Sequence, residues 1–135
     1  MRKETKTALI ALPIIFLSNL IIGVIFGYGF KHDFFNTVHH YLGGVFVALF
    51  FLGYLNEVVA SKEIPLLKKW FIIVSATLFV GAVWEFSEWI GSYYDFKYLS
   101  IGDLEDTLKD LAVDSLGAVT LLLLHPLGER DSKKS

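Results

Sequence analysis

The chain has 135 residues, of which 54% are hydrophobic and only 19% are charged, and its formal net charge is −2. Soluble domains have roughly 45–50% apolar and 25% charged residues, so this composition favours an integral membrane protein. The small net charge and the lack of a basic patch argue against nucleic-acid binding, and the absence of cysteine excludes disulfides, thiolate metal sites and cysteine nucleophiles.

Four apolar segments are long enough to cross a bilayer, which takes about 20 helical residues. We predict helices over about residues 7–29, 39–60, 70–93 and 107–127. Backbone polar groups in lipid need partners within their own segment, which favours helices over isolated strands. The first segment is longer than the apolar part of a signal peptide, so we expect it to be retained. The sequence therefore predicts an all-α polytopic membrane protein, with one membrane domain over 1–135 forming a four-transmembrane-helix bundle.

Lysine and arginine residues divide unevenly between the two sides that four spans would create. The side holding both termini carries nine: Arg2, Lys3, Lys6, Lys62, Lys68, Lys69, Arg130, Lys133 and Lys134. The other side carries three: Lys31, Lys97 and Lys109. Because cytoplasmic loops are enriched in these residues, we predict a multi-pass protein of the cell (plasma) membrane with both termini in the cytoplasm.

The second predicted helix begins with two histidines, His39 and His40, at its outer end. Gly43 and Gly44 follow them by one turn, and small residues there would let a neighbouring helix approach closely. Both histidines could be ordinary interfacial residues. We expect one of the two to be functional, and the sequence does not distinguish between them.

The third predicted helix carries Glu85 and Glu88 on adjoining parts of one face, at i,i+3 spacing. Counting about 20 residues from Trp70 places Glu85 roughly 6 Å below the outer membrane surface. Gly81 lies one turn before Glu85, so this face is small and polar and should contact protein. Glu88 sits higher and could instead remain solvated at the interface.

The fourth predicted helix carries four aspartates, Asp103, Asp106, Asp110 and Asp114, within a face about 80° wide at 100° per residue. If the helix ends near residue 127, Asp110 lies roughly 5 Å and Asp114 roughly 10 Å below the outer boundary. Asp103 and Asp106 could simply cap the helix and complement its dipole. The two deeper aspartates are harder to explain by solvation.

Three helices thus place ionisable groups at a similar depth, and a charge in lipid costs several kcal/mol unless it is paired or solvated. We therefore expect one shared cavity that opens to the outer face. Carboxylates with an imidazole suit Mg²⁺, Mn²⁺ or Ca²⁺, and with both histidines Zn²⁺. Without a cation, some carboxylates would stay protonated and could move protons. The candidate metal ligands are Glu85, Asp106, Asp110 and Asp114, the candidate catalytic residues are His39, His40 and Glu88, and Asp103 is a further candidate.

Three motifs resemble the YjdF-like bacterial inner-membrane proteins. They are Val38-His39-His40-Tyr41-Leu42-Gly43-Gly44, Trp84-Glu85-x-x-Glu88-Trp89, and Gly102-Asp103-x-x-Asp106-Thr107-x-x-Asp110 followed by Gly117-Ala118. The resemblance covers roughly residues 38–118, and the order of motifs is loosely similar to that of VanZ-like membrane proteins. YjdF-like proteins have no established activity. The resemblance therefore supports the candidate site residues and implies no reaction.

Three kinds of function remain open from the sequence. The first is a divalent-cation-dependent enzyme that acts on a lipid or lipid-linked phosphate at the outer leaflet. The second is a cation or proton transporter or channel subunit, which would need an inner half supplied by Asn56, Glu57 or a homo-oligomer. The third is an accessory structural protein, in which the polar cluster only holds helices together.

Overall fold

The computed structural model describes residues 1–19, 21–22, 33–58, 64–94 and 104–125. These ranges contain four helices and no strand: α1 (Lys3–Ser18), α2 (Asp33–Val58), α3 (Leu66–Tyr93) and α4 (Leu104–Leu124). The prediction of an all-α protein is confirmed for the part of the chain that the structure describes.

The helices begin earlier than the apolar segments suggested. α2 starts at Asp33 rather than at residue 39, and α3 starts at Leu66 rather than at residue 70. Polar residues at a helix start can keep helical geometry because their side chains still reach water or a neighbouring helix. The prediction that the histidines stand at the start of α2 is therefore wrong, and His40 lies about two turns inside the helix.

Some predicted helix ends lie outside the described residues. This applies to residue 20 and residues 23–29 of the first segment, residues 59–60 of the second and residues 126–127 of the fourth. The third predicted segment ends at Tyr93, which is also the last residue of α3.

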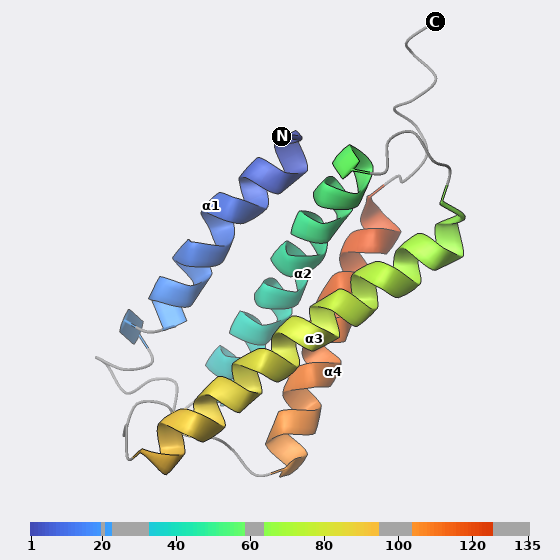
Figure 1. Cartoon of the computed structure of the whole chain (residues 1–135). Helices are drawn as coiled ribbons and strands as arrows, with labels where there is room; N and C mark the ends of the chain where they lie inside the picture. The colour runs from blue at the N-terminus through green and yellow to red at the C-terminus, as the bar shows by residue number, and fades with distance from the viewer. Residues whose placement is uncertain (20, 23–32, 59–63, 95–103, 126–135) are drawn as a thin grey trace, which may run out of the picture.

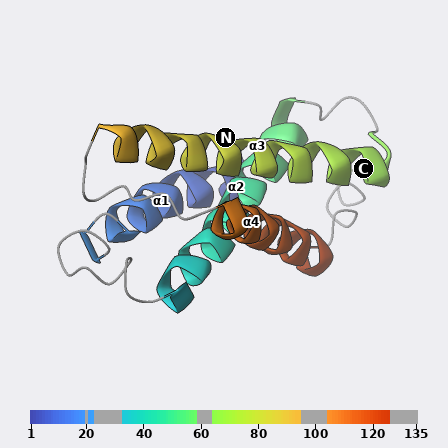
Figure 2. The ribbon, with the colours of Figure 1, turned by 90° about the horizontal axis from the view of Figure 1, so that it is seen from below.

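α2 is the central helix of the molecule (Figure 1), in contact with α1, α3 and α4. α3 crosses one face of the other helices, as the view from below also shows (Figure 2). We call the end of the bundle where α2 and α4 begin and where α1 and α3 end the site end. The other end is called the opposite end.

Glycines set the close approach of α2 to α4. A Cβ atom added at Gly44 would overlap the backbone carbonyl of Asp114, and one added at Gly117 would overlap the carbonyl of Tyr41. Small residues let helix backbones come together in this way when there is no strong hydrophobic force between helices in lipid. The two glycines therefore fix Asp114 directly against the first half of α2.

A buried apolar cluster occupies the middle of the bundle. It consists of Ala48, Leu52, Ile73, Ala118 and Leu122. On α2 and on α4, these residues lie between the polar side chains of the site end and those of the opposite end. The cluster thus separates the two ends of the molecule by several turns of apolar helix.

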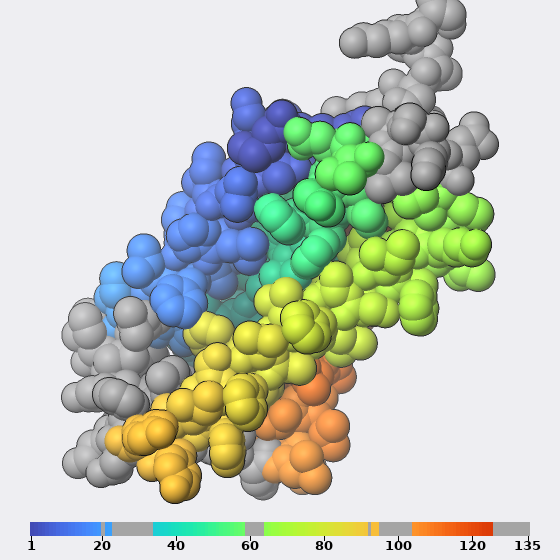
Figure 3. Space-filling view, viewed as in Figure 1, coloured from blue at the N-terminus to red at the C-terminus, as the bar shows by residue number. Residues whose placement is uncertain are grey.

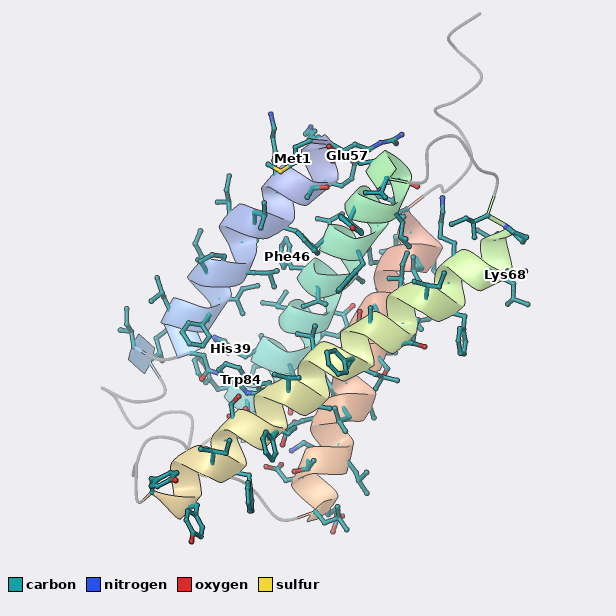
Figure 4. The ribbon with its side chains drawn as sticks, in the orientation of Figure 1. Met1, His39, Phe46, Glu57, Lys68 and Trp84 are labelled. Atoms are coloured by element: carbon teal, nitrogen blue, oxygen red, sulfur yellow. The ribbon has the colours of Figure 1, made fainter. Side chains whose placement is uncertain are left out.

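Polar contacts join all four helices at the opposite end. The amino group of Met1 lies 3.1 Å from the Glu57 carboxylate (Figure 4), and Lys69 donates a hydrogen bond of 2.7 Å to Asn56. Glu4 of α1 lies 3.9 Å from His125, just after α4. These contacts are specific to this end and involve none of the candidate site residues.

Two helices are long and apolar enough to cross a membrane among the described residues: Phe34–Val58, with a mean hydropathy of 1.5, and Leu66–Gly91, with a mean hydropathy of 1.8. Large apolar side chains also cover the outside of the molecule, including Phe71, Phe79, Phe86, Leu123 and Leu124. Such a large exposed apolar surface is typical of a protein that contacts lipid.

Candidate metal centre

Four ionisable side chains are buried together near the site end. The exposed fraction is 6% for His40 on α2, 6% for Glu85 on α3, and 2% and 5% for Asp110 and Asp114 on α4. His40, Glu85 and Asp110 stand roughly 9–12 Å from the nearest ends of their helices at 1.5 Å per residue. The three residues thus lie at similar distances from the ends of their helices.

The imidazole of His40 lies at the centre of this group. Its Nε2 atom is 3.4 Å from Asp110 Oδ2 and 3.8 Å from Glu85 Oε1. Its Nδ1 atom is 3.4 Å from Asp114 Oδ1. The two ring nitrogens therefore face different carboxylates: Asp114 on one side, and Asp110 with Glu85 on the other.

Two neutral residues hold the carboxylates in place. The amide of Asn36 donates a hydrogen bond of 2.7 Å to Asp110 Oδ2, and the hydroxyl of Thr107 donates one of 2.9 Å to Glu85 Oε2. Neither residue was predicted from the sequence. Asn36 precedes His40 by one turn, and Thr107 lies on the face of α4 that carries Asp110, so helical spacing could have identified both.

Several polar atoms of the group have no hydrogen bond in the described structure. They are His40 Nε2, Glu85 Oε1, Asp110 Oδ1 and Asp114 Oδ2. A buried polar atom without a partner costs about 1–3 kcal/mol, and more when it is charged. The four atoms lie close together and leave hydrogen-bonding positions that a ligand could occupy.

The donor set fits a divalent cation. His40, Glu85 and Asp110 each offer one ligand atom, and these atoms all lie within 4.8 Å of one another. One imidazole with two carboxylates suits borderline and hard cations such as Mn²⁺ and Zn²⁺. When one ring nitrogen of a histidine binds a metal, the N–H of the other nitrogen is usually donated to a carboxylate. If Nε2 of His40 binds the cation, Asp114 near Nδ1 is in the position of that carboxylate.

His39 points away from this group. Its Nε2 atom is 3.0 Å from the hydroxyl of Ser18 on α1, and its Nδ1 atom is 3.0 Å from the carbonyl oxygen of Phe35. Neighbouring residues on a helix are separated by 100°, so only one of the two histidines can face α3 and α4. Of the two histidines, His40 is the one that lies among the carboxylates.

The remaining candidates occupy the edge of the group or lie beyond it. Glu88 is half-buried and accepts a hydrogen bond of 3.0 Å from the indole of Trp84. Asp106 is more than a third exposed and lies 2.7 Å from Lys109. Asp103 lies outside the described residues.

Comparison with known proteins gives one family. The family described as "Predicted membrane protein (DUF2238)" matches residues 2–128. No curated protein and no solved structure matches the chain. The match spans nearly the whole sequence, including all four buried ionisable residues, and it agrees with an apolar chain that has two long membrane-compatible helices. The chain therefore belongs to this family of predicted membrane proteins.

Proposed function

We propose that the chain is a four-span protein of the plasma membrane, with both termini in the cytoplasm and a divalent cation held by His40, Glu85 and Asp110. The cation would serve an enzyme reaction on a lipid or lipid-linked phosphate at the outer leaflet. The observation that carries the proposal is the convergence of three buried candidate ligand residues from α2, α3 and α4, each with one ligand atom within 4.8 Å of the others.

Four spans are favoured by the way α4 buries its charges. α4 has 21 residues, a rise of roughly 31 Å, which matches a hydrocarbon core of about 30 Å. Its aspartates Asp110 and Asp114 face the inside of the bundle rather than the outside. A helix with this pattern can cross lipid, because its exposed residues after Lys109 are apolar, while the exposed or partly exposed charged residues Glu105, Asp106 and Lys109 all lie near its start, where they can reach water.

The reaction we propose is hydrolysis of a phosphate ester. When bound, the cation would polarise a phosphate oxygen and favour attack by water. The water oxygen bonds to phosphorus while the bond between phosphorus and the lipid oxygen breaks. Glu88, one turn from Glu85 and half-buried, would take one proton from the water and deliver it to the leaving oxygen.

Transport receives less support from the arrangement of polar groups. Between the buried site and the polar contacts of the opposite end lies the apolar cluster around Leu52 and Leu122. A proton or ion path would need polar groups or water through this region. A purely structural role is the main alternative, because His40 lies within ion-pair distance of all three carboxylates, and Asn36 and Thr107 donate hydrogen bonds to two of them.

Metal content separates these possibilities. The wild-type protein, purified in detergent, is expected to carry about one Mn²⁺ or Zn²⁺ per chain. Glu85→Gln and Asp110→Asn should each lose the ion, because each removes a charged ligand. Glu105→Gln is the matched control, since Glu105 is exposed near the start of α4 and is not a candidate ligand, and it should keep the ion. A folded wild-type protein that binds no divalent ion, or equal binding in all three variants, would contradict the proposal.

A further inference from the structure

A cavity of about 310 Å³ is lined by residues of α1, α2 and α3. Figure 3 shows α2 recessed between the other two helices. Most of the cavity wall is apolar, and its lining residues include Leu12, Ile15, Phe16, Val47 and Val80. The volume is at the lower end of the range for small-molecule sites. The cavity therefore suits a small ligand that is apolar over most of its surface.

Of the described residues of α4, only Asp114 lines the cavity, and its carboxylate lies next to two glycines that also line it. A Cβ atom added at Gly81 of α3 would overlap Asp114 Oδ2, and one added at Gly43 of α2 would lie 4.0 Å from Asp114 Oδ1. Oδ1 is 3.4 Å from Nδ1 of His40, whereas Oδ2 has no hydrogen bond in the described structure. Asp114 is only 5% exposed. A buried carboxylate oxygen without a partner thus lies at the cavity wall.

The buried group that contains Asp114 carries more negative than positive charge. It holds three carboxylates, those of Glu85, Asp110 and Asp114, around one imidazole. When all three are ionised, a protonated imidazole leaves two negative charges, and a divalent cation at the proposed site leaves one. Among the residues that the structure describes, no lysine or arginine lines the cavity. Because a buried charge in a membrane protein is costly unless it is paired, a cationic ligand in the cavity would be stabilised in either state.

A primary ammonium group matches this carboxylate. Its N–H groups only donate, and a hydrogen bond from an ammonium to a carboxylate is strengthened by the two charges. The hydroxyl of Thr77 also lines the cavity and donates its own hydrogen to the carbonyl oxygen of Ile73, so its oxygen can accept from a ligand. Phe16 and Trp84 line the cavity with ring centroids 5.4 Å apart, and aromatic rings attract cations. An inorganic cation would find few oxygen ligands in such a wall, whereas an alkyl group is stabilised there.

We propose that this cavity binds a small lipophilic amine, with its ammonium group against Asp114 and its apolar part against the side chains of α1, α2 and α3. The inference goes beyond the proposed function and does not need the cation, because Glu85 and Asp110 do not line the cavity. The ammonium end of an aminolipid has the same chemistry. Such a lipid would also bring a phosphate against the apolar wall and close to the Asp114 carboxylate, so the ligand is a free amine.

The test uses the fluorescence of Trp84 in the full chain carrying Trp70→Phe and Trp89→Phe, in phosphatidylcholine nanodiscs. The probes are 8-bromooctylamine, which is protonated at neutral pH as lysine is, and 8-bromooctan-1-ol. The bromine of each probe quenches a nearby indole. A second chain, with Trp70→Phe and Trp84→Phe, keeps only Trp89, which is 49% exposed. Quenching of Trp89 corrects for the amount of each probe that enters the bilayer.

After this correction, the amine is expected to quench Trp84 at about tenfold lower mole fraction than the alcohol. We call this difference the amine preference. Octylamine without bromine should reverse the quenching, and ammonium chloride, which lacks an apolar part, should not. Nanodiscs that contain phosphatidylethanolamine should give the same amine preference. Reversal by phosphatidylethanolamine would show that the ligand is an aminolipid and would overturn the assignment of a free amine.

Asp114→Asn should abolish the amine preference and leave quenching by the alcohol unchanged, because the cavity keeps its shape. Gly43→Leu places a side chain in the cavity and should protect Trp84 from both probes, whereas Ala82→Leu adds the same side chain on the exposed face of α3 and should change nothing. Equal quenching by the two probes in the chain with Asp114 and Gly43 intact would overturn the inference. So would an amine preference that survives either Asp114→Asn or Gly43→Leu, so the test stays decisive if one variant does not fold.

Metal content, measured on the same samples, separates this inference from the proposed function. An amine preference in a protein without a divalent ion would support the amine site and contradict the proposed function. A bound ion without an amine preference would do the reverse.

Discussion

Asp110 and Asp114 lie one turn apart on α4 and are both buried, but they face different nitrogens of His40. Asp110 lies near Nε2 with Glu85, whereas Asp114 lies near Nδ1. If Nε2 binds the cation, Asp110 is a ligand and Asp114 orients the imidazole. The two aspartates should therefore differ in how much their removal weakens metal binding.

Asp114→Asn is expected to lower the affinity for Mn²⁺ by about 10–100-fold, as loss of a carboxylate behind a metal-binding histidine does. Asp110→Asn should abolish binding at the same concentrations. Titration of the two purified variants with Mn²⁺, followed by electron paramagnetic resonance of the free ion, measures both affinities. Equal affinities in the two variants would mean that the roles assigned to the two aspartates are wrong.

For single residues, the sequence predicted which carboxylates lie together but not which side chains contact them. Depth below the membrane surface singled out Glu85, Asp110 and Asp114, and all three are buried together. The choice between His39 and His40 depended on the rotation of α2 about its axis. Apolar patterning does not define that rotation well, because lipid-facing and protein-facing sides of α2 are both hydrophobic.

The contact between α2 and α4 decides whether the site can assemble. Gly43 and Gly44 are neighbours in the sequence, but a Cβ atom at Gly44 would overlap the Asp114 backbone and one at Gly43 would not. The same substitution at these two adjacent positions adds the same side chain, but only at Gly44 does that side chain disturb the contact between α2 and α4.

Gly44→Ala is expected to destabilise the protein by about 1–3 kcal/mol, because overpacking forces the two backbones apart. Gly43→Ala should change stability by less than about 1 kcal/mol, since the added methyl group makes only an ordinary contact. Thermal unfolding in detergent, followed by circular dichroism, compares the two variants. Similar unfolding temperatures for both would show that α2 and α4 are not held as close as described.

The existence of the helices followed from the sequence, while their starts did not. Runs of about 20 apolar residues predict a span, but they measure the hydrocarbon thickness rather than the length of the helix. α2 begins at Asp33 rather than at residue 39 and therefore includes Asn36, which lies one turn before His40. Helix starts in the headgroup region are set by polar side chains, so a search for apolar segments misses them.

For the whole molecule, we propose that the two ends of α3 lie on opposite sides of the membrane. Leu67 is 82% exposed and Tyr94 is 67% exposed, one near each end of α3. The chain contains no cysteine, so each position can be tested with a single introduced thiol. The uneven distribution of lysine and arginine predicts that Leu67 is on the cytoplasmic side.

Tyr94→Cys should react in intact cells with a membrane-impermeant maleimide, whereas Leu67→Cys should react only after the membrane is opened. Both variants should be labelled to the same extent in detergent, which controls for local accessibility. The reverse pattern would place the site on the cytoplasmic side, and labelling of both in intact cells would contradict a membrane-spanning α3.

The central claim is that the imidazole of His40 binds a divalent cation together with Glu85 and Asp110. Pulsed electron paramagnetic resonance of Mn²⁺ bound to the purified protein detects coordinated nitrogen directly. A nitrogen modulation is expected in the wild type and in His39→Gln, and its loss is expected in His40→Gln. Mn²⁺ that binds the wild type without any nitrogen modulation, or a modulation that persists in His40→Gln, would contradict the account.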